Sequence, residues 1–176
     1  MFFLWLCKFK LKEIKIIMRS LQRYHSTDKK NTLVSWGKAQ NPLKVFANII
    51  ITELASYMPI FIKNPLYKTI GIKIGKNAAI AYRVRMDMVF PELISIGDNT
   101  IIGYNTTVLT HEFLMHEWRK GHVKIGKNVM IGANCTILAG VSIGDNSVIS
   151  SMSLVNKSIP PNSFAYGNPV KVRKKK

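Results

Sequence analysis

Three of the four histidines in this 176-residue chain lie close together in one polar stretch, at His111, His116 and His122. An unperturbed imidazole has a pKa of about 6.5, so near neutral pH it can take a proton from a hydroxyl group as a general base. Neutral imidazole is also a common ligand of zinc. The same stretch carries a carboxylate at Glu112 and an indole ring at Trp118. Proton transfer and metal binding are therefore the first chemistries to consider.

The residues on both sides of this stretch follow a period of six, which neither an α-helix nor an ordinary β-strand produces. Apolar side chains stand at the repeated position, at Ile74, Ile80, Met86, Ile96, Ile102, Val108, Ile125, Ile131, Ile137, Ile143, Ile149 and Val155. A small or β-branched residue lies four places later, as at Val129, and a glycine often follows directly, as at Gly126. We expect a solenoid with three flat faces, in which the aliphatic residues stack inward and the glycines allow tight turns with φ > 0.

Two interruptions of the repeat mark where function is expected, because loops on rigid scaffolds commonly carry binding and catalytic residues. The step from Met86 to Ile96 spans ten residues instead of six and includes Asp87. The larger interruption is the excursion 109–122, which contains the three clustered histidines.

Within the excursion, His111 lies nearest to the solenoid. A neutral imidazole is held best when its second nitrogen bonds a carboxylate or a carbonyl. One coil takes about eighteen residues, so Asp87 should stack next to Leu109, within reach of His111. Glu112 and Glu117 are alternative partners, and a solvated carboxylate is the alternative interpretation of Asp87.

The repeat and its closing segment resemble those of the hexapeptide-repeat acyltransferases, and within them the small O-acetyltransferases that act on sugars and related hydroxyl compounds. The matching segments are Ile96-Gly97-Asp98-Asn99, Ile125-Gly126-Lys127-Asn128-Val129, Ile131-Gly132-Ala133-Asn134, Val141-Ser142-Ile143-Gly144-Asp145-Asn146, Lys157-Ser158-Ile159-Pro160-Pro161-Asn162 and Gly167-Asn168-Pro169. The resemblance covers roughly residues 72–172. It implies an all-β solenoid, a left-handed parallel β-helix of roughly five coils assembled as a homotrimer, with an N-terminal α-helical segment and a short C-terminal tail.

The resemblance also implies acetyl transfer from acetyl-CoA to a hydroxyl group by direct attack, with each site formed between two subunits. In the similar enzymes a histidine at the point where a loop leaves the solenoid acts as the base, and His111 holds that place. The coenzyme would lie in the groove between neighbouring solenoids, at the matching positions Ala133, Ser151, Lys157 and Lys171. This chemistry requires no metal.

On the acceptor side we expect Glu112, His116 and Trp118. The Trp118 ring would stack on a sugar or else pin the excursion to its neighbour. The chain departs from the family at Ser150-Ser151-Met152, where Gly-Ala-Gly is usual, and the bulkier Met152 would narrow the channel or alter the acyl group accepted. A cell-surface polysaccharide, a small sugar and an antibiotic all stay open as acceptors.

Two other functions use the same architecture. Carbonic anhydrases built on left-handed β-helices hold zinc with three histidines, two of them in the His-x4-His spacing that His111 and His116 share. Zinc needs rigid ligands that converge, and no third histidine lies on an earlier coil, which argues against this function. The other alternative is a non-catalytic trimeric scaffold at a membrane surface.

The composition narrows the partners and the compartment. A net charge of +17 attracts polyanions, such as the phosphates of coenzyme A, an anionic membrane or nucleic acid. No nucleic-acid-binding module is recognisable, so we expect no nucleic-acid partner. The two cysteines, Cys7 and Cys135, exclude a disulfide framework, and Cys135 should be a packed thiol at an inward position. We expect a cytoplasmic protein, with peripheral contact at the inner face of the membrane as an option.

The chain divides into four parts. Residues 1–17 are either an upstream extension or a basic amphipathic segment on a membrane surface. Residues 18–70 form an N-terminal helical and linker region, and the stretch Val45–Ile62 predicts an amphipathic helix that ends around Pro59. Residues 71–172 form the β-helix domain, and 173–176 a basic tail. No stretch reaches the roughly 20 apolar residues of a membrane span.

Overall fold

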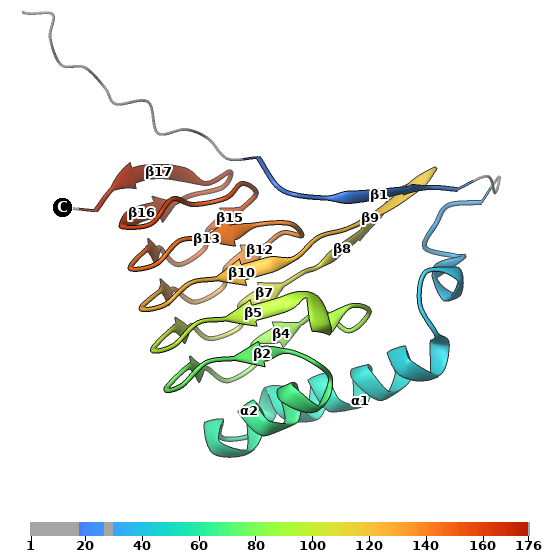
Figure 1. Cartoon of the computed structure of the whole chain (residues 1–176), viewed down its shortest axis with the longest axis horizontal. Helices are drawn as coiled ribbons and strands as arrows, with labels where there is room; N and C mark the ends of the chain where they lie inside the picture. The colour runs from blue at the N-terminus through green and yellow to red at the C-terminus, as the bar shows by residue number, and fades with distance from the viewer. Residues whose placement is uncertain (1–17, 27–29, 176) are drawn as a thin grey trace, which may run out of the picture.

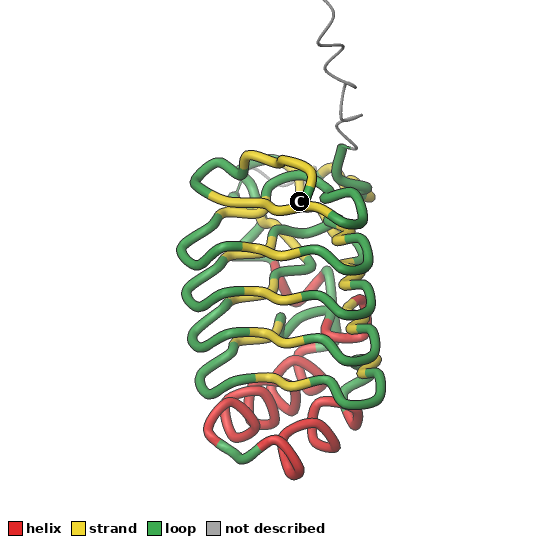
Figure 2. The backbone as a smooth tube through the Cα atoms, turned by 90° about the vertical axis from the view of Figure 1, so that its left-hand side faces the viewer, coloured by secondary structure: helices red, strands yellow, loops and turns green. Residues whose placement is uncertain are grey.

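The computed structural model of the chain describes residues 18–26 and 30–175, so the expectation for residues 1–17 lies outside the described part. The chain winds into a parallel β-helix whose coils stack along one axis, with two helices across one end (Figure 1, Figure 2). Each complete coil contributes one short strand to each of three parallel sheets. The three-faced solenoid predicted from the period of six is confirmed.

The first sheet contains β2 (Lys73–Ile74), β5 (Ile94–Ile96), β10 (Val123–Ile125) and β13 (Ser142–Ile143). The second sheet contains β3 (Ala79–Ile80), β6 (Ile101–Ile102), β11 (Met130–Ile131), β14 (Val148–Ile149), β16 (Ser163–Tyr166) and β17 (Lys171–Lys174). The third sheet contains β4 (Arg85–Met86), β7 (Thr107–Val108), β12 (Thr136–Ile137) and β15 (Leu154–Val155). The chain thus forms four complete coils and a partial fifth, where Ile159 bridges to Ile143.

The repeated apolar side chains form one continuous core along the axis. All of them are at most 9% exposed, and Ile80, Ile102 and Ile137 are fully buried. Burying each of these side chains contributes about 1.5–3 kcal/mol. Cys135 is a buried free thiol among them, as expected, and its burial raises the pKa of the thiol.

The repeat glycines have a different role from the one we expected. The corner residues with φ > 0 are mostly asparagines, three places after the repeated apolar residue, at Asn77, Asn99, Asn105, Asn128, Asn134, Asn146 and Asn162. Asparagine tolerates this conformation better than most residues. A Cβ at Gly97 would instead lie 2.5 Å from the carbonyl oxygen of Gly126 in the next coil. Glycine is needed there because the backbones of successive coils nearly touch.

Two helices, α1 (Pro42–Tyr57) and α2 (Ile60–Thr69), lie across the open end of the first coil (Figure 1, Figure 2). The helix expected from Val45 and ending around Pro59 corresponds to α1, and residues 60–62 belong to α2. Met58 is extended, with φ −84° and ψ 156°, because a residue that precedes a proline is driven out of the helical region. Pro59 then begins α2 as its N-cap residue.

Side chains of α2 complete the hydrogen bonding of the first coil, which has no coil before it. Tyr67 Oη donates to the carbonyl of Val84 at 3.0 Å, and Lys63 Nζ donates to the carbonyl of Ala81 at 2.7 Å. Lys63 is only 1% exposed, and burial lowers the pKa of its ammonium. Because unpaired edge carbonyls are costly when buried, these bonds explain how a helix can cap a β-helix.

The excursion 109–122, expected as a loop, is a β-hairpin of β8 (His111–Phe113) and β9 (Glu117–Lys120). Strand β1 (Gln22–His25) pairs antiparallel with β9, so part of the N-terminal region expected to be helical or linker forms a strand. Short 3-10 helices occur at Trp36–Lys38 and at Pro91–Leu93.

The far end of the solenoid is closed by β17, which runs antiparallel to β16. We expected residues 173–176 to form a basic tail. Arg173 and Lys174 instead belong to this strand. The Arg173 guanidinium lies 4.7 Å from the centre of the Phe164 ring, a cation–π contact that holds the strand in place. Within the described residues, no helix is long and apolar enough to cross a membrane.

Candidate active site

Asp87 and His111 meet at the corner where the chain passes from the third sheet to the first. Met86 of β4 and Val108 of β7 are register partners, so the residues that follow them leave adjacent coils side by side. His111 Nδ1 lies 2.6 Å from Asp87 Oδ2. The structure therefore brings together the two residues that the coil length places next to each other.

The Asp87 carboxylate is 3% exposed, and four donors surround it. Its Oδ1 accepts hydrogen bonds from the amides of Val89 (2.8 Å) and Phe90 (3.0 Å), and its Oδ2 accepts one from the amide of Thr110 (2.7 Å). Burial by itself raises the pKa of Asp87. The bond and charge of His111 and the amide bonds outweigh burial, so the pKa of Asp87 lies below its ordinary value of 3.8.

This environment decides which nitrogen of His111 carries the proton in the neutral ring. An ionised carboxylate only accepts hydrogen bonds, so Nδ1–H of His111 donates to Asp87. Nε2 is then left with its lone pair and can take a proton from a substrate. A histidine held by a buried carboxylate is the arrangement of a general base.

The hairpin beside this pair has two chemically different faces. His111, Phe113, Trp118 and Lys120 alternate onto one face, because successive strand residues point to opposite sides. Glu112, Glu117 and Arg119 lie on the other face. There Glu112 pairs with Arg19 and Arg119, and Glu117 pairs with Arg119. Glu112, expected on the acceptor side, is thus held in an ion-pair network away from His111.

An aromatic cluster covers the face that carries His111. The Trp118 ring stacks on Tyr24 with ring centres 4.1 Å apart and on Phe90 with centres 5.7 Å apart. The His111 ring lies edge-on to Phe113 at 4.9 Å and to Phe90 at 6.1 Å. This stacking joins the hairpin to β1 and to the segment between β4 and β5 that contains Phe90. Within the chain, Trp118 therefore pins the hairpin to its neighbouring segments.

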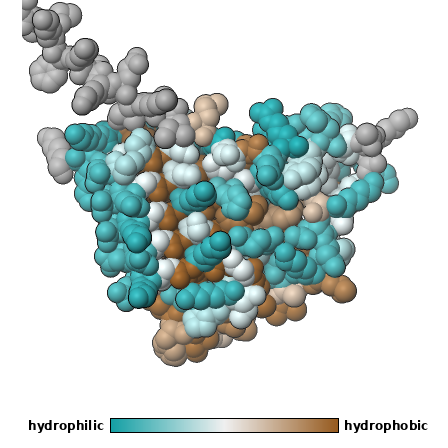
Figure 3. Space-filling view, in the orientation of Figure 1, coloured by the Kyte–Doolittle hydropathy of each residue, from teal (hydrophilic) through white to brown (hydrophobic). Residues whose placement is uncertain are grey.

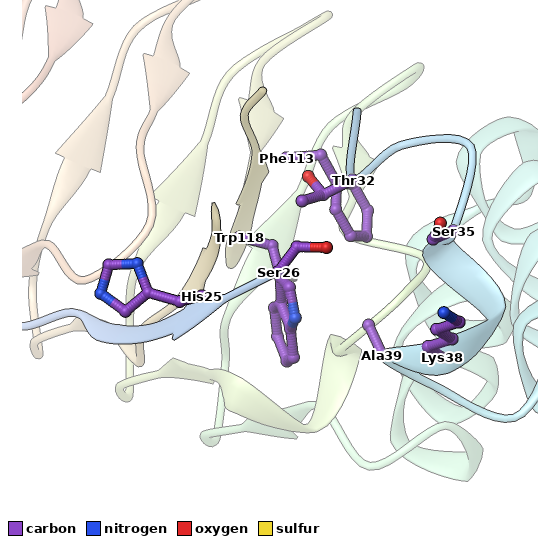
Figure 4. Close-up of a pocket in the computed structure, with 8 residues that line it drawn as sticks. All are labelled: His25, Ser26, Thr32, Ser35, Lys38, Ala39, Phe113 and Trp118. Atoms are coloured by element: carbon purple, nitrogen blue, oxygen red, sulfur yellow. The ribbon is translucent and has the colours of Figure 1, made fainter. Parts of the chain in front are cut away.

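Phe113 and Trp118 also line a cavity of about 180 Å³ between the hairpin and the segment that leads to α1 (Figure 4). Ser35 and Lys38 lie on its opposite side, whereas Thr32 lies beside Phe113, where its hydroxyl donates to the carbonyl of Leu114 at 2.7 Å. Because Phe113 contacts His111, one side chain separates this cavity from His111. His116 is exposed at the hairpin turn and does not line it.

The expected coenzyme positions lie apart from His111 within one chain. Ala133 and Ser151 share the corner between the second and third sheets, where the Ala133 amide donates to Ser151 Oγ at 3.2 Å. Lys157 follows β15 in the last complete coil, and Lys171 is exposed at the start of β17. Met152 also stands at this corner, with φ 62° and 70% exposure, so its side chain projects outward.

Sequence reasoning missed the support that the N-terminal segment gives to the hairpin. Arg19 bonds Glu112, and the amide of Ser20 donates to the carbonyl of Gly140 at 2.9 Å. Residues 19–25 read RSLQRYH and show no regular alternation of apolar and polar side chains, so the sequence carried no strand signal there. Among the described residues, no three histidine, cysteine or carboxylate side chains gather as metal ligands.

Comparison with known protein families and sequences gives the same assignment from independent evidence. Residues 122–157 match the family model described as bacterial transferase hexapeptide (six repeats). A Bacillus subtilis protein named "Putative acetyltransferase YvoF" is 53% identical over 132 residues, which are 74% of this chain and 77% of that protein. The galactoside O-acetyltransferase of Escherichia coli is 39% identical over 121 residues, 64% of this chain and 59% of that protein.

Among solved structures, the hexapeptide-repeat acetyltransferase VCA0836 of Vibrio cholerae, crystallised with acetyl coenzyme A, superimposes with a TM-score of 0.64 at 25% identity. The match covers 76% of this chain and 87% of that one. A maltose O-acetyltransferase from Clostridium difficile superimposes with a TM-score of 0.55 at 25% identity, over 88% and 92% of the two chains. The fold is the left-handed parallel β-helix of these enzymes, as the sequence predicted.

Replacing Asp87 by asparagine should destabilise the protein near neutral pH by about 3 kcal/mol, because the amide cannot accept all four bonds of the buried carboxylate. Since the pKa of Asp87 is lowered from 3.8, its stabilisation is complete above that pH and is lost as the pH falls through the lowered pKa. Urea unfolding at pH 6 and pH 3 should therefore show a smaller difference between the two proteins at pH 3. An equal difference at both pH values would contradict this assignment.

Proposed function

This chain belongs to the hexapeptide-repeat acetyltransferases, and on that premise we propose that it transfers an acetyl group from acetyl-CoA to a hydroxyl group of a saccharide. The observation that carries the proposal is the pair formed by Asp87 and His111, with Nδ1 of His111 2.6 Å from the carboxylate. The relatives named galactoside and maltose O-acetyltransferase support a sugar as the acceptor.

The proposed reaction is a direct attack without an acyl-enzyme. Nε2 of His111 takes the proton of the acceptor hydroxyl as its oxygen bonds to the thioester carbonyl carbon. The tetrahedral intermediate then collapses as the carbon–sulfur bond breaks, and the departing thiolate recovers the proton from His111. Asp87 holds the ring in the productive tautomer and stabilises the imidazolium that forms between the two steps. Backbone amides near the groove would hold the oxyanion.

The coenzyme positions support a site shared between two subunits. Ala133 and Ser151 lie at the corner between the second and third sheets, whereas His111 lies at the corner between the third and the first. A second copy that presents its own Ala133–Ser151 corner to His111 would complete the site. Lys157 and Lys171 would then meet the phosphates of the coenzyme, and the outward Met152 would border its channel.

The outer surface of the second sheet supports a homotrimer. Its outward positions form an apolar column of Ala79, Ile101, Met130, Val148 and Phe164. Ile101 is 51% exposed and Met130 is 52% exposed in the single chain. The corresponding positions of the first sheet, Lys73, Ser95, Lys124 and Ser142, are polar. An apolar column on one sheet only is typical of a surface covered by another subunit.

We also propose a cytoplasmic enzyme that contacts the inner face of the membrane. Large apolar side chains project from α1 and the start of α2, away from the coils: Leu43 (80% exposed), Phe46 (60%), Ile50 (67%), Leu54 (48%) and Phe61 (77%). Figure 3 shows the resulting hydrophobic surface at the lower end of the molecule. With the net charge of +17, such a surface suits an anionic bilayer, and a trimer would present three copies together.

The His111→Ala variant should lower turnover about 10²–10⁴-fold, because the general base is removed. Affinity for acetyl-CoA should stay within about twofold, since His111 is not one of the coenzyme positions. His111→Gln is the matched variant, because it keeps a donor near Asp87 but cannot take the proton. Steady-state kinetics and calorimetry measure both effects, and full activity in either variant would remove His111 from the mechanism.

The Met130→Glu variant should sediment as a monomer and lose transferase activity, because a charge is costly in the proposed subunit interface. Ser95→Glu, at an outward position of the first sheet, is the control and should remain a trimer. Sedimentation velocity measures the oligomeric state of the wild-type protein and of both variants. A monomeric wild-type protein, or a trimer formed by Met130→Glu, would be evidence against this interface.

Membrane contact is tested by flotation with vesicles that contain about 30% phosphatidylserine, compared with pure phosphatidylcholine. Replacing Phe46 and Ile50 together by serine should abolish the binding, because it removes apolar surface from the centre of the patch. Leu33 and Val34 are 61% and 63% exposed but lie outside α1 and α2, so replacing both by serine should leave vesicle binding unchanged. Binding that survives the first double substitution would show that α1 is not the contact surface.

A further inference from the structure

A second cavity, of about 150 Å³, lies at the base of the hairpin, on the side of the first sheet. The polar side chains that line it are Ser20, Gln22, Lys120, His122, Lys124 and Ser142. All of them can donate hydrogen bonds, and three can carry positive charge. Its described lining contains no carboxylate. The cavity is therefore equipped for an anion and not for a cation.

The cationic side chains of this cavity are not neutralised by the protein. Neither Lys120, His122 nor Lys124 has an ion-pair partner among the described residues, whereas Arg19 and Arg119 on the hairpin's opposite face do. Lys120 is also held in position, with Nζ 4.9 Å from the centre of the Phe90 ring, 5.3 Å from that of Tyr24 and 5.8 Å from that of Trp118. Cation–π contacts with aromatic rings orient an ammonium without cancelling its charge.

The cavity is adjacent to the proposed base. Lys120 of β9 is the register partner of His111 in β8, and both side chains lie on the same face of the hairpin. The amide of Gly121, which also lines the cavity, donates to the carbonyl of Thr110 at 2.9 Å. A ligand group in the cavity would thus lie next to Lys120, the strand neighbour of His111.

A longer hollow continues from this cavity over the outer surface of the first sheet. It measures about 440 Å³, shares Ser20, Lys124, Gly140 and Ser142 with the smaller cavity, and ends at Pro160 and Pro161. The two hollows together offer a path along several coils. Such a path suits a chain of linked units better than a single small molecule.

We propose that the cavity lined by Lys120, His122 and Lys124 is an oxyanion-binding site, which holds a carboxylate or phosphate substituent of the substrate while His111 acts on a neighbouring hydroxyl. This inference rests on the proposed acetyl transfer and narrows its acceptor to an acidic saccharide chain. The net charge of +17 would draw such a polymer to the groove. The coenzyme's phosphates are the other source of the same chemistry, because Ser158, next to Lys157, lines the far end of the longer hollow.

The experiment measures binding without catalysis. A hexamer of galacturonic acid, and maltohexaose as its neutral counterpart, are titrated by calorimetry into the whole protein at 150 mM salt without acetyl-CoA. Replacing Lys120 and Lys124 together by methionine should weaken binding of the acidic hexamer about tenfold and leave maltohexaose unchanged. The control is Lys73→Met, which removes one positive charge from the same sheet as Lys124, two coils away, and should change affinity less than twofold.

The two ligands, the acidic hexamer and acetyl-CoA, distinguish the two possible sources of the bound anion. A loss confined to the acidic hexamer supports the site with the acceptor as its source. A loss of acetyl-CoA affinity, measured with the same variants, supports an anion site that serves the coenzyme. Equal losses in the double variant and in Lys73→Met, or no loss in either, would overturn the proposal. Because no transfer is needed for these measurements, a failure of the acetyl-transfer hypothesis would not be mistaken for a failure of the site.

Discussion

The close approach of successive coil backbones is the constraint on which the rest of the structure depends. A side chain at Gly97 would overlap the backbone of Gly126, and one at Gly103 would overlap that of Gly132, so the coils can stack only with glycine at these points. The stacked aliphatic side chains then lock a single register from β2 to β15. Because interiors are packed this tightly, a shift of one coil against its neighbour is not available. Every corner of the solenoid consequently has a defined place.

That register accounts for the chemistry at Asp87 and His111. The two residues leave β4 and β7 at neighbouring levels, and the protein buries a carboxylate there that it satisfies completely with three amides and one imidazole. A buried charge is tolerated only when it is bonded in this way. The same bonds hold the ring of His111, and the braced hairpin keeps it at the edge of the rigid coil. The satisfaction of the buried carboxylate and the orientation of the His111 ring are therefore two consequences of one bonding arrangement.

The distribution of charge links the coenzyme, the acceptor and the membrane. Several of the nine acidic residues are tied into local bonds, as Asp98 is with Lys127, Glu92 with Lys44 and Glu117 with Arg119. Three of the remaining cationic side chains, Lys120, His122 and Lys124, line one hollow at the base of the hairpin. A positive field of this kind raises the local concentration of anionic ligands and is weakened by salt. The net positive charge thus favours all three proposed contacts, with the coenzyme, the acidic acceptor and the anionic membrane.

The sequence by itself determined the solenoid, its inward residues and the place of His111, because a period of six is a local pattern that few folds satisfy. It also brought Asp87 within reach of His111, since the length of a coil converts a distance along the chain into a neighbour in space, but it left Glu112 and Glu117 open as partners. It did not reveal that Asn99 and Asn128 form the positive-φ corners, or that Gly97 serves the contact between coils. Only the tertiary structure decided that β1 braces the hairpin, that Glu112 turns away to Arg19, and that Lys120 stands over three aromatic rings. These contacts join segments with no shared period, so their partners depend on where the folded solenoid happens to bring them.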